Sequence, residues 1–198
     1  RTAPAAADYL VRLSDTPVVV LRHALSGCTT AGSPPTVPTT ARNVIEKFRS
    51  GKRFAVHLIM FRNASLRIAD EDPDYRIHSV YEMLRYPHSS AAGKLMLAEL
   101  ADSAPPFPNG PLMQLTQHTI TDRGQLEQQL AEIRLKGHAS EINELEQGSA
   151  SLAFPVGLPN GPAGAALCLS SPAERFAHIC EYTEAAREMT SRLAPVLF

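Results

Sequence analysis

One stretch of the chain restricts its fold more than any other. From Phe54 to Phe61 every residue is apolar except His57. A run of this length between polar residues is typical of a strand buried on both faces of a sheet. A second run, from Ser65 to Ala69, follows a turn at Arg62-Asn63 and predicts a hairpin. The core is therefore expected to form around a sheet.

Apolar residues at helical spacing predict the elements that cover this sheet. One helix is expected from Thr40 to Ser50 and another from Ser89 to Leu100. Asp122, with Gln125 three residues later, has the form of a capping box and begins a third helix, which Gly137 ends. The apolar residues of this third helix are Leu126, Leu130 and Ile133.

The second half of the chain predicts another hairpin and a last helix. Ser149–Val156 and Ala163–Ser170 are expected to be strands, with a turn at Asn160-Gly161. Ser171–Glu174 resembles a capping box with proline at the first helical position. The helix it begins has an apolar stripe at Phe176, Ile179, Thr183, Ala186, Thr190, Leu193 and Leu197. Ile77–Met83 is a possible further strand.

Helices and hairpins are mixed along the chain and do not alternate strictly. This pattern predicts an α+β fold, with an antiparallel sheet flanked by helices. A chain of 198 residues can bury a core without a disulfide or a metal. Before the first helix, Tyr9–Leu25 is consistent with either helix or strand, and we favour helix. The Pro- and Ser-rich residues 27–38 predict a linker.

Composition excludes several classes of protein. Lys and Arg number 19 and Asp and Glu number 20, a net charge of −1, which argues against a chain that binds nucleic acid throughout. No apolar run approaches the ~18 residues of a membrane span. Three cysteines without a CxxC pair favour a reducing compartment, so a cytoplasmic location is expected. Because the chain starts at Arg1 and not at Met, we expect it to be part of a longer protein.

The common catalytic and cofactor motifs do not occur. Gly93-Lys94 is followed by Leu95, so it is not a phosphate-binding P-loop. The sequence has no GxGxxG, no GxSxG and no HExxH among its seven histidines. Neither a cofactor nor a metal ion is expected.

Two candidate nucleophiles each have an ordinary structural interpretation as well. Ser90 and Lys94 lie four residues apart on one helix and could form a Ser–Lys dyad. A serine at a helix start and an exposed lysine are the favoured interpretation, because no third group is evident. Cys168 lies in an apolar strand and is expected to be a small buried hydrophobe, since a reactive thiol needs nearby cations.

The start of the second helix is rich in small residues. Free backbone N–H groups at a helix start can bind a carboxylate or a phosphate, and Ala91, Ala92 and Gly93 have no bulk to block one. Tight packing of the helix against the sheet would require small residues too. The sequence leaves both interpretations open.

Residues Tyr86–Ala98 read YPHSSAAGKLMLA. They resemble the phrase LPLHATALGKALLA found in the effector-binding domains of IclR-family bacterial transcription regulators. Other stretches similar to the family follow in the same order and cover, with this one, roughly residues 40–198: Leu115-Thr116, Thr119–Asp122, Leu126–Gly137, Glu144–Val156 and Gly164–Arg175.

The resemblance implies a GAF-like, or profilin-like, domain that binds a small effector, often an organic or aromatic acid. In the family a winged helix-turn-helix domain precedes it and binds DNA as a dimer or tetramer. Residues 1–38 would then be the end of the DNA-binding wing, a linker helix and a flexible linker. Residues 39–198 would be the effector-binding domain. We accordingly expect a homodimer or homotetramer, DNA contact only through the absent domain, and no membrane.

The resemblance also implies which residues line the effector site. The helix start at Ser90, Ala91 and Ala92 would present N–H groups to a ligand carboxylate. An acidic position matches Glu141, in a segment expected to be a loop. Strand positions that match are Ser151, Cys168 and Ser170, and Ser149 is added because residues two apart share one side of a strand.

Other interpretations of these residues stay open at this point. Ser151 could bond only to a neighbouring backbone group, and Ser170 could cap the last helix. The chain could instead be an enzyme of the hydrolase or amidase kind that uses Ser90 or Cys168, with Glu141 a further candidate. It could also be a module for assembly alone, without a pocket.

Overall fold

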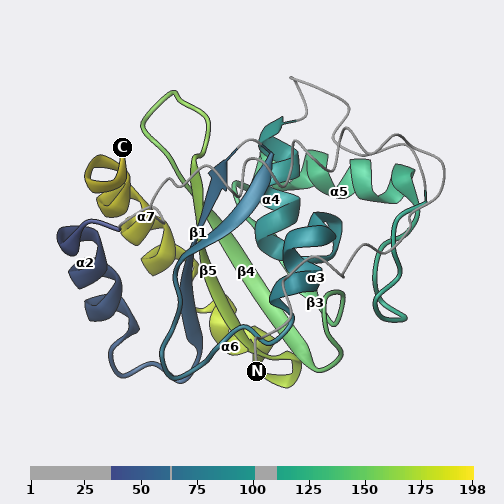
Figure 1. Ribbon diagram of the computed structural model, residues 1–198, viewed down its shortest axis with the longest axis horizontal. Helices are drawn as coiled ribbons and strands as arrows, with labels where there is room; N and C mark the ends of the chain where they lie inside the picture. The colour runs from purple at the N-terminus through teal and green to yellow at the C-terminus, as the bar shows by residue number, and fades with distance from the viewer. Residues whose placement is uncertain (1–36, 63, 101–110) are drawn as a thin grey trace, which may run out of the picture. The chain divides into compact units, whose positions relative to one another are not determined.

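The computed structural model describes residues 37–62, 64–100 and 111–198. Its strands form one five-stranded sheet in the order β2-β1-β5-β4-β3 (Figure 1). Every neighbouring pair is antiparallel, which confirms the α+β prediction. The strands are β1 Ala55–Arg62, β2 Ser65–Asp70, β3 Ala139–Ile142, β4 Ser149–Val156 and β5 Ala165–Pro172.

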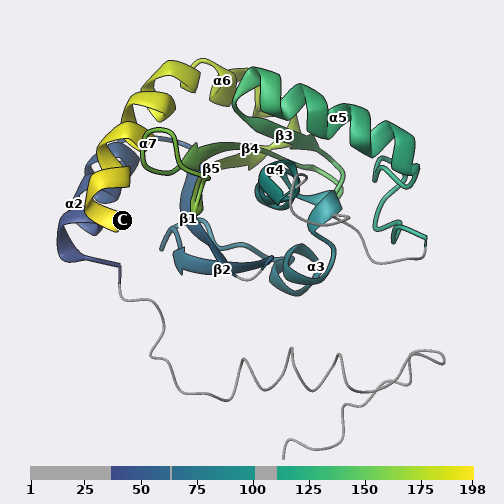
Figure 2. The same cartoon turned by 90° about the horizontal axis from the view of Figure 1, so that it is seen from above.

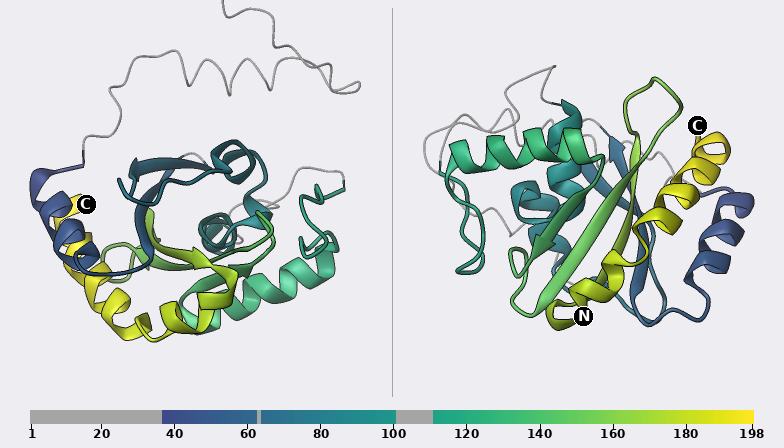
Figure 3. Two further views of the ribbon diagram at one scale, coloured as in Figure 1. Left: turned by 90° about the horizontal axis from the view of Figure 1, so that it is seen from below. Right: turned by 180° about the vertical axis from the view of Figure 1, so that it is seen from behind.

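Helices cover both faces of the sheet. Seen from above, the sheet curves around α4, whereas α2 and α7 lie on the other face (Figure 2). α2 and α7 contact each other, and α6 packs on the same face (Figure 3). The α-helices are α2 Thr39–Arg49, α3 Val80–Arg85, α4 Ala91–Leu100, α5 Arg123–Lys136, α6 Phe176–Cys180 and α7 Thr183–Leu197, and the 3₁₀ turns are η1 Pro87–Ser89 and η2 Ala173–Arg175.

Alternate residues of the central strands enter two separate cores. Val56 and Leu58 of β1 pack with α2 and α7, while Ile59 packs with α4 and α5. In β5, Leu167 belongs to the core with α2 and α7, and Ala166 belongs to the core with α4 and α5. The apolar run at 54–61 is therefore buried on both faces, as predicted.

The predicted helix caps of α5 are present. Asp122 accepts a hydrogen bond at Oδ1 from the backbone N of Gln125, at 2.7 Å. Gly137 ends the helix in the left-handed conformation, with φ of +67°. Leu126, Leu130 and Ile133 are buried, so the predicted stripe faces the core.

The prediction of a strand at Ile77–Met83 is wrong. Residues 77–79 belong to no helix or strand, and α3 begins at Val80. The apolar residues Ile77, Val80 and Met83 recur every third position, which is a helical spacing. Met83 is the buried residue of α3.

The prediction of one continuous last helix is also wrong. Ser171 and Pro172 stay in β5, where they pair with Ala150 and Ser149. The Ser171 hydroxyl bonds to the carbonyl of Pro172 and caps no helix. Sheet pairing thus overrides the local capping signal, and the helical segment is divided into η2, α6 and α7.

Several sequence predictions fall outside the described residues. These are the helix or strand at Tyr9–Leu25, the linker up to residue 36 and the turn residue Asn63.

Candidate functional site

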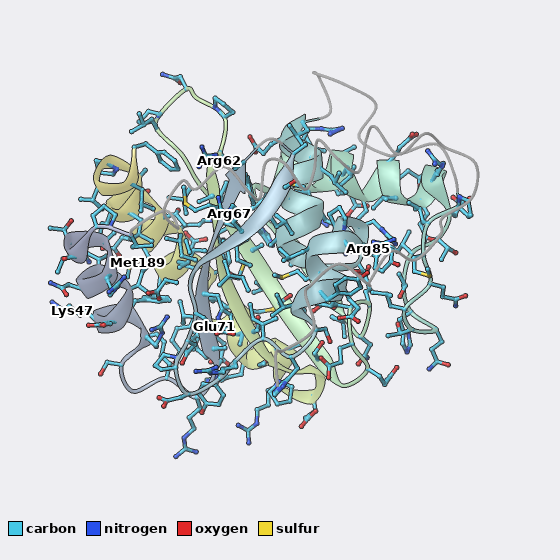
Figure 4. All side chains as sticks on the ribbon, viewed as in Figure 1. Lys47, Arg62, Arg67, Glu71, Arg85 and Met189 are labelled. Atoms are coloured by element: carbon cyan, nitrogen blue, oxygen red, sulfur yellow. The ribbon has the colours of Figure 1, made fainter. Side chains whose placement is uncertain are left out.

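A cavity of about 650 Å³ lies between the sheet, the start of α4 and residues 73–79. We call residues 73–79 the wall segment. It follows β2 closely, beyond Glu71, which is labelled in Figure 4. The cavity is lined by all eight residues predicted for the site: Ser90, Ala91, Ala92, Glu141, Ser149, Ser151, Cys168 and Ser170.

The polar part of the cavity floor is one row of residues across four strands. Ala55 pairs with Ser170, Ser170 with Ser151, and Ser151 with Glu141. Directly opposed residues project from the same face of a sheet, so their side chains are neighbours. Strand pairing therefore brings together residues that are more than a hundred positions apart in the sequence, such as Ala55 and Ser170.

Glu141 lies in β3 and not in a loop, which corrects the sequence prediction. The strand has only four residues and follows Gly137 closely, so its alternation of apolar and polar residues is too short to indicate a strand. Its pairing with β4 places the Glu141 side chain beside Ser151. Likewise Ser170 lies within β5 and does not cap the last helix.

The Glu141 carboxyl group is buried and held by two hydrogen bonds. The Ser151 hydroxyl donates to Oε1 at 3.0 Å, and the backbone N of Glu144 donates to Oε2 at 3.1 Å. Burial raises the pKa of Glu141 to about 7, against the opposing effect of these bonds and of the Lys94 charge. The group can therefore gain or lose a proton near neutral pH.

The start of α4 packs tightly against its neighbours and also borders the cavity. Gly93 serves packing, because a Cβ atom there would lie 2.1 Å from the carbonyl oxygen of Pro87. Ser90 caps the helix, its hydroxyl accepting from the backbone N of Gly93 at 3.1 Å. Ala91 and Ala92 line the cavity, and N–H groups in a first helical turn have no acceptor within the helix.

Lys94 is completely buried, whereas the sequence predicted an exposed lysine. Its Nζ atom lies 2.7 Å from Oε1 of Glu144. Burial lowers the pKa of Lys94 and the Glu144 carboxylate raises it. Because Lys94 is paired with Glu144 and the Ser90 hydroxyl with Gly93, the two side chains do not form a catalytic dyad.

Cys168 is an unreactive thiol at the centre of the floor. Burial raises the pKa of Cys168 to about 12, so the thiolate that a nucleophile needs is not formed at neutral pH. This supports the sequence interpretation of Cys168 as a small buried hydrophobe.

His57 is a polar cavity residue that sequence reasoning did not assign to the site. It lies opposite Cys168 and lines the cavity with only 2% of its surface exposed. Its Nδ1 atom accepts a hydrogen bond from the backbone N of Asp72 at 3.1 Å. Burial lowers the pKa of His57 to about 4, so the ring is neutral. The available signal was its place as the one polar residue in the apolar run at 54–61.

Charges of both signs surround the cavity mouth. Arg53, Asp74, Arg76, His78 and Glu146 are exposed residues of its lining. In the described part of the chain no group of three or more His, Cys, Asp or Glu side chains could hold a metal ion. The same residues include no helix that is long and apolar enough to cross a membrane.

Residues 40–194 match the family described as bacterial transcriptional regulator IclR, C-terminal. This match spans most of the chain. The chain belongs to this family. As an IclR C-terminal domain it is a regulatory domain and not an enzyme, so the hydrolase or amidase alternative is excluded.

Solved structures of several regulators share the IclR C-terminal fold. IclR of Thermotoga maritima is 24% identical, with a TM-score of 0.63 over 89% of this chain and 74% of its own. The C-terminal domain of Escherichia coli KdgR is 20% identical, with a TM-score of 0.64 over 81% of this chain and 98% of its own.

A third structure contains a ligand. It is a double mutant of the inducer-binding domain of the transcription factor PobR from Acinetobacter, in complex with 3-hydroxybenzoic acid. It is 20% identical, with a TM-score of 0.62 over 80% of this chain and 97% of its own. Among curated proteins no sequence matches the chain.

Proposed function

We propose that this IclR C-terminal domain senses a small organic or aromatic acid and thereby controls DNA binding by a winged helix-turn-helix domain of the same protein. The observation that supports the proposal is that one cavity is lined by all eight residues expected to bind the effector. A volume of about 650 Å³ falls within the range of small-molecule sites.

The start of α4 favours an acid as the ligand. The N–H groups of Ala91 and Ala92 and the positive end of the helix dipole attract a carboxylate. The ligand of the Acinetobacter relative, 3-hydroxybenzoic acid, supports an aromatic acid as one class to test.

An effector can control DNA binding if its affinity differs between two arrangements of the subunits. Residues 1–38 remain the proposed end of the DNA-binding wing and linker, and residues 39–198 the effector-binding domain, in a homodimer or homotetramer. An acid that binds one arrangement of the subunits more tightly shifts the population toward it. On the full-length protein, that acid should change the affinity for the operator.

A thermal-shift screen tests the cavity first. The chain is mixed with millimolar 3-hydroxybenzoate, short-chain acids and oxo acids. An acid at about 100 times its Kd stabilises the fold by about 2.7 kcal/mol, which raises Tm by roughly 5–10 °C for a domain of this size.

Blocking the cavity is the control for the screen. Ser170→Phe fills the floor without removing a helix cap, unlike a change at Ser90. Ser191→Phe, at an exposed serine of α7, adds the same ring outside the cavity. The shift should vanish in the first variant and persist in the second. If no acid shifts Tm, the sensing proposal is wrong, and a module for assembly alone becomes the better interpretation.

A further inference from the structure

We propose that His57 donates a hydrogen bond from Nε2 to a second acceptor oxygen of the effector, and so selects acids that carry an oxo or second carboxylate oxygen. This inference rests on the proposed function, because it presumes that an acid occupies the cavity. It concerns the end of the ligand that lies over β1, away from the carboxylate at α4.

The hydrogen-bonding role of each ring nitrogen is fixed by the protein. The backbone N–H of Asp72 points at Nδ1, so Nδ1 must be the acceptor and the proton resides on Nε2. Asp72 is itself held firmly: its Oδ2 accepts from the backbone N of Val56 at 3.0 Å and lies 3.1 Å from Nε of Arg49. The ring therefore cannot exchange its donor and acceptor ends without breaking this arrangement.

The Nε2–H group has no acceptor among the residues that the structure describes. The Nε2 atom is itself accessible from the cavity, since among these same residues the buried polar atoms without a partner are those of Arg49, Gln129 and Glu144. A ligand that covers Nε2–H must supply an acceptor, because a donor buried without a partner costs free energy. Because the ring lines the cavity, a bound molecule can supply that acceptor.

Within β1, His57 is the residue of the cavity face whose side chain can donate a hydrogen bond. Its neighbours on the cavity face of β1, Ala55 and Ile59, are apolar, and the opposed Cys168 is a protonated thiol. Glu141 lies three strands away on β3, about 14 Å at ~4.8 Å per strand. The floor therefore offers a neutral donor at one end and a carboxyl group at the other.

A neutral donor recognises oxygen by hydrogen bonding and not by charge. A ketone and a carboxylate both satisfy Nε2–H, whereas a methylene at the same position leaves it unpaired. Discrimination is strong in such cases, because the unmatched ligand leaves a buried polar group without a partner.

Matched pairs of acids test the inference. The probes are 4-oxopentanoate against pentanoate and 4-acetylbenzoate against 4-ethylbenzoate, titrated by calorimetry. The unmodified chain should bind the oxo member of at least one pair about 10- to 100-fold more tightly. His57→Phe should abolish that preference, and His57→Gln should restore part of it, because the amide keeps an N–H donor. His118→Gln, at an exposed histidine outside the cavity, should leave it unchanged.

Each outcome distinguishes the two proposals. Equal affinity for both members of each pair, or a preference retained in His57→Phe, overturns the role of His57 and leaves acid sensing intact. No binding of any acid overturns the sensing function and this inference with it. If a variant does not fold, an NMR measurement on the unmodified chain still tests the inference. The Nε2–H resonance of His57 should shift with 4-oxopentanoate and stay in place with pentanoate.

Discussion

At the scale of single residues, His57 and Glu141 have pKa values shifted by burial in opposite senses. The pKa of His57 is lowered to about 4, so the stability it contributes is present above pH 6.5 and is lost as the pH falls toward 4. The pKa of Glu141 is raised to about 7, so its contribution is present below pH 4.5 and is lost as the pH rises toward 7. Between pH 4.5 and 6.5 the two contributions oppose each other.

Removing either group should reveal how the other makes the free energy of unfolding depend on pH. Relative to the unmodified chain, Glu141→Gln should gain free energy of unfolding as the pH rises from 4.5 to 6.5, and His57→Phe should lose it. Each change should approach about 3 kcal/mol. Urea unfolding at pH 4.5, 5.5 and 6.5 measures both. If the free energy of unfolding of a variant changes with pH as that of the unmodified chain does, the pKa shift assigned to the removed group is contradicted.

The Lys94–Glu144 ion pair gives a second residue-scale prediction. Lys94→Met should cost about 3–5 kcal/mol, because it leaves the Glu144 carboxylate buried without its partner. Adding Glu144→Leu should recover part of the loss, since no buried charge then remains. Lys136→Met, which breaks an exposed pair with Glu132, should cost under about 1 kcal/mol. Urea unfolding measures these losses. If the substitutions at Lys94 and Lys136 lower the free energy of unfolding equally, burial of the ion pair does not determine the loss.

At the scale of elements, the contact of η1 with α4 depends on Gly93. Gly93→Ala should destabilise the fold by about 1–3 kcal/mol, because the new Cβ meets the backbone of Pro87 and neither element can yield alone. Gly124→Ala in α5 is the matched control. Its Cβ meets only the side-chain oxygen of Asp122, at 3.3 Å, so a change within about 1 kcal/mol is expected. Thermal unfolding compares the two, and a Gly93→Ala as stable as the control would contradict the packing role.

Long elements with complete local signals were predictable from sequence, and short ones were not. The strands β1, β4 and β5 have apolar runs, and α5 carries both of its caps, so pattern and structure agree. The four residues of β3 gave no usable period. At Ser171-Pro172 the local capping signal was complete, yet pairing with β4 kept the chain in the sheet.

At the scale of the whole molecule, the family resemblance and strand alternation predicted eight residues that line the cavity, but no sequence pattern indicated how these residues interact. Register across four strands brings Ser170, Ser151 and Glu141 into one row, and it depends on contacts distant in sequence. The burial of Lys94 likewise depends on Glu144, fifty positions away. Such partners leave no local pattern that a single sequence could reveal.

Hydrogen exchange should report occupancy of the cavity across the whole fold. The wall segment, which forms no helix or strand, should exchange fast in the free protein and slow down when an acid binds. The central strand β5, hydrogen-bonded on both sides, should be slow throughout. Mass spectrometry of peptides from the two regions measures this. Slowing confined to α2 and α7, on the opposite face, would place the ligand elsewhere.

Asp72 contacts both the cavity histidine and α2, which lies on the other face of the sheet. When an acceptor draws on Nε2–H, electron density in the imidazole moves toward Nδ1, and the bond from the Asp72 backbone strengthens. The Asp72 carboxylate lies 3.1 Å from Arg49, in the last turn of α2. One aspartate thus holds the ring that faces the ligand and also contacts a helix that does not line the cavity.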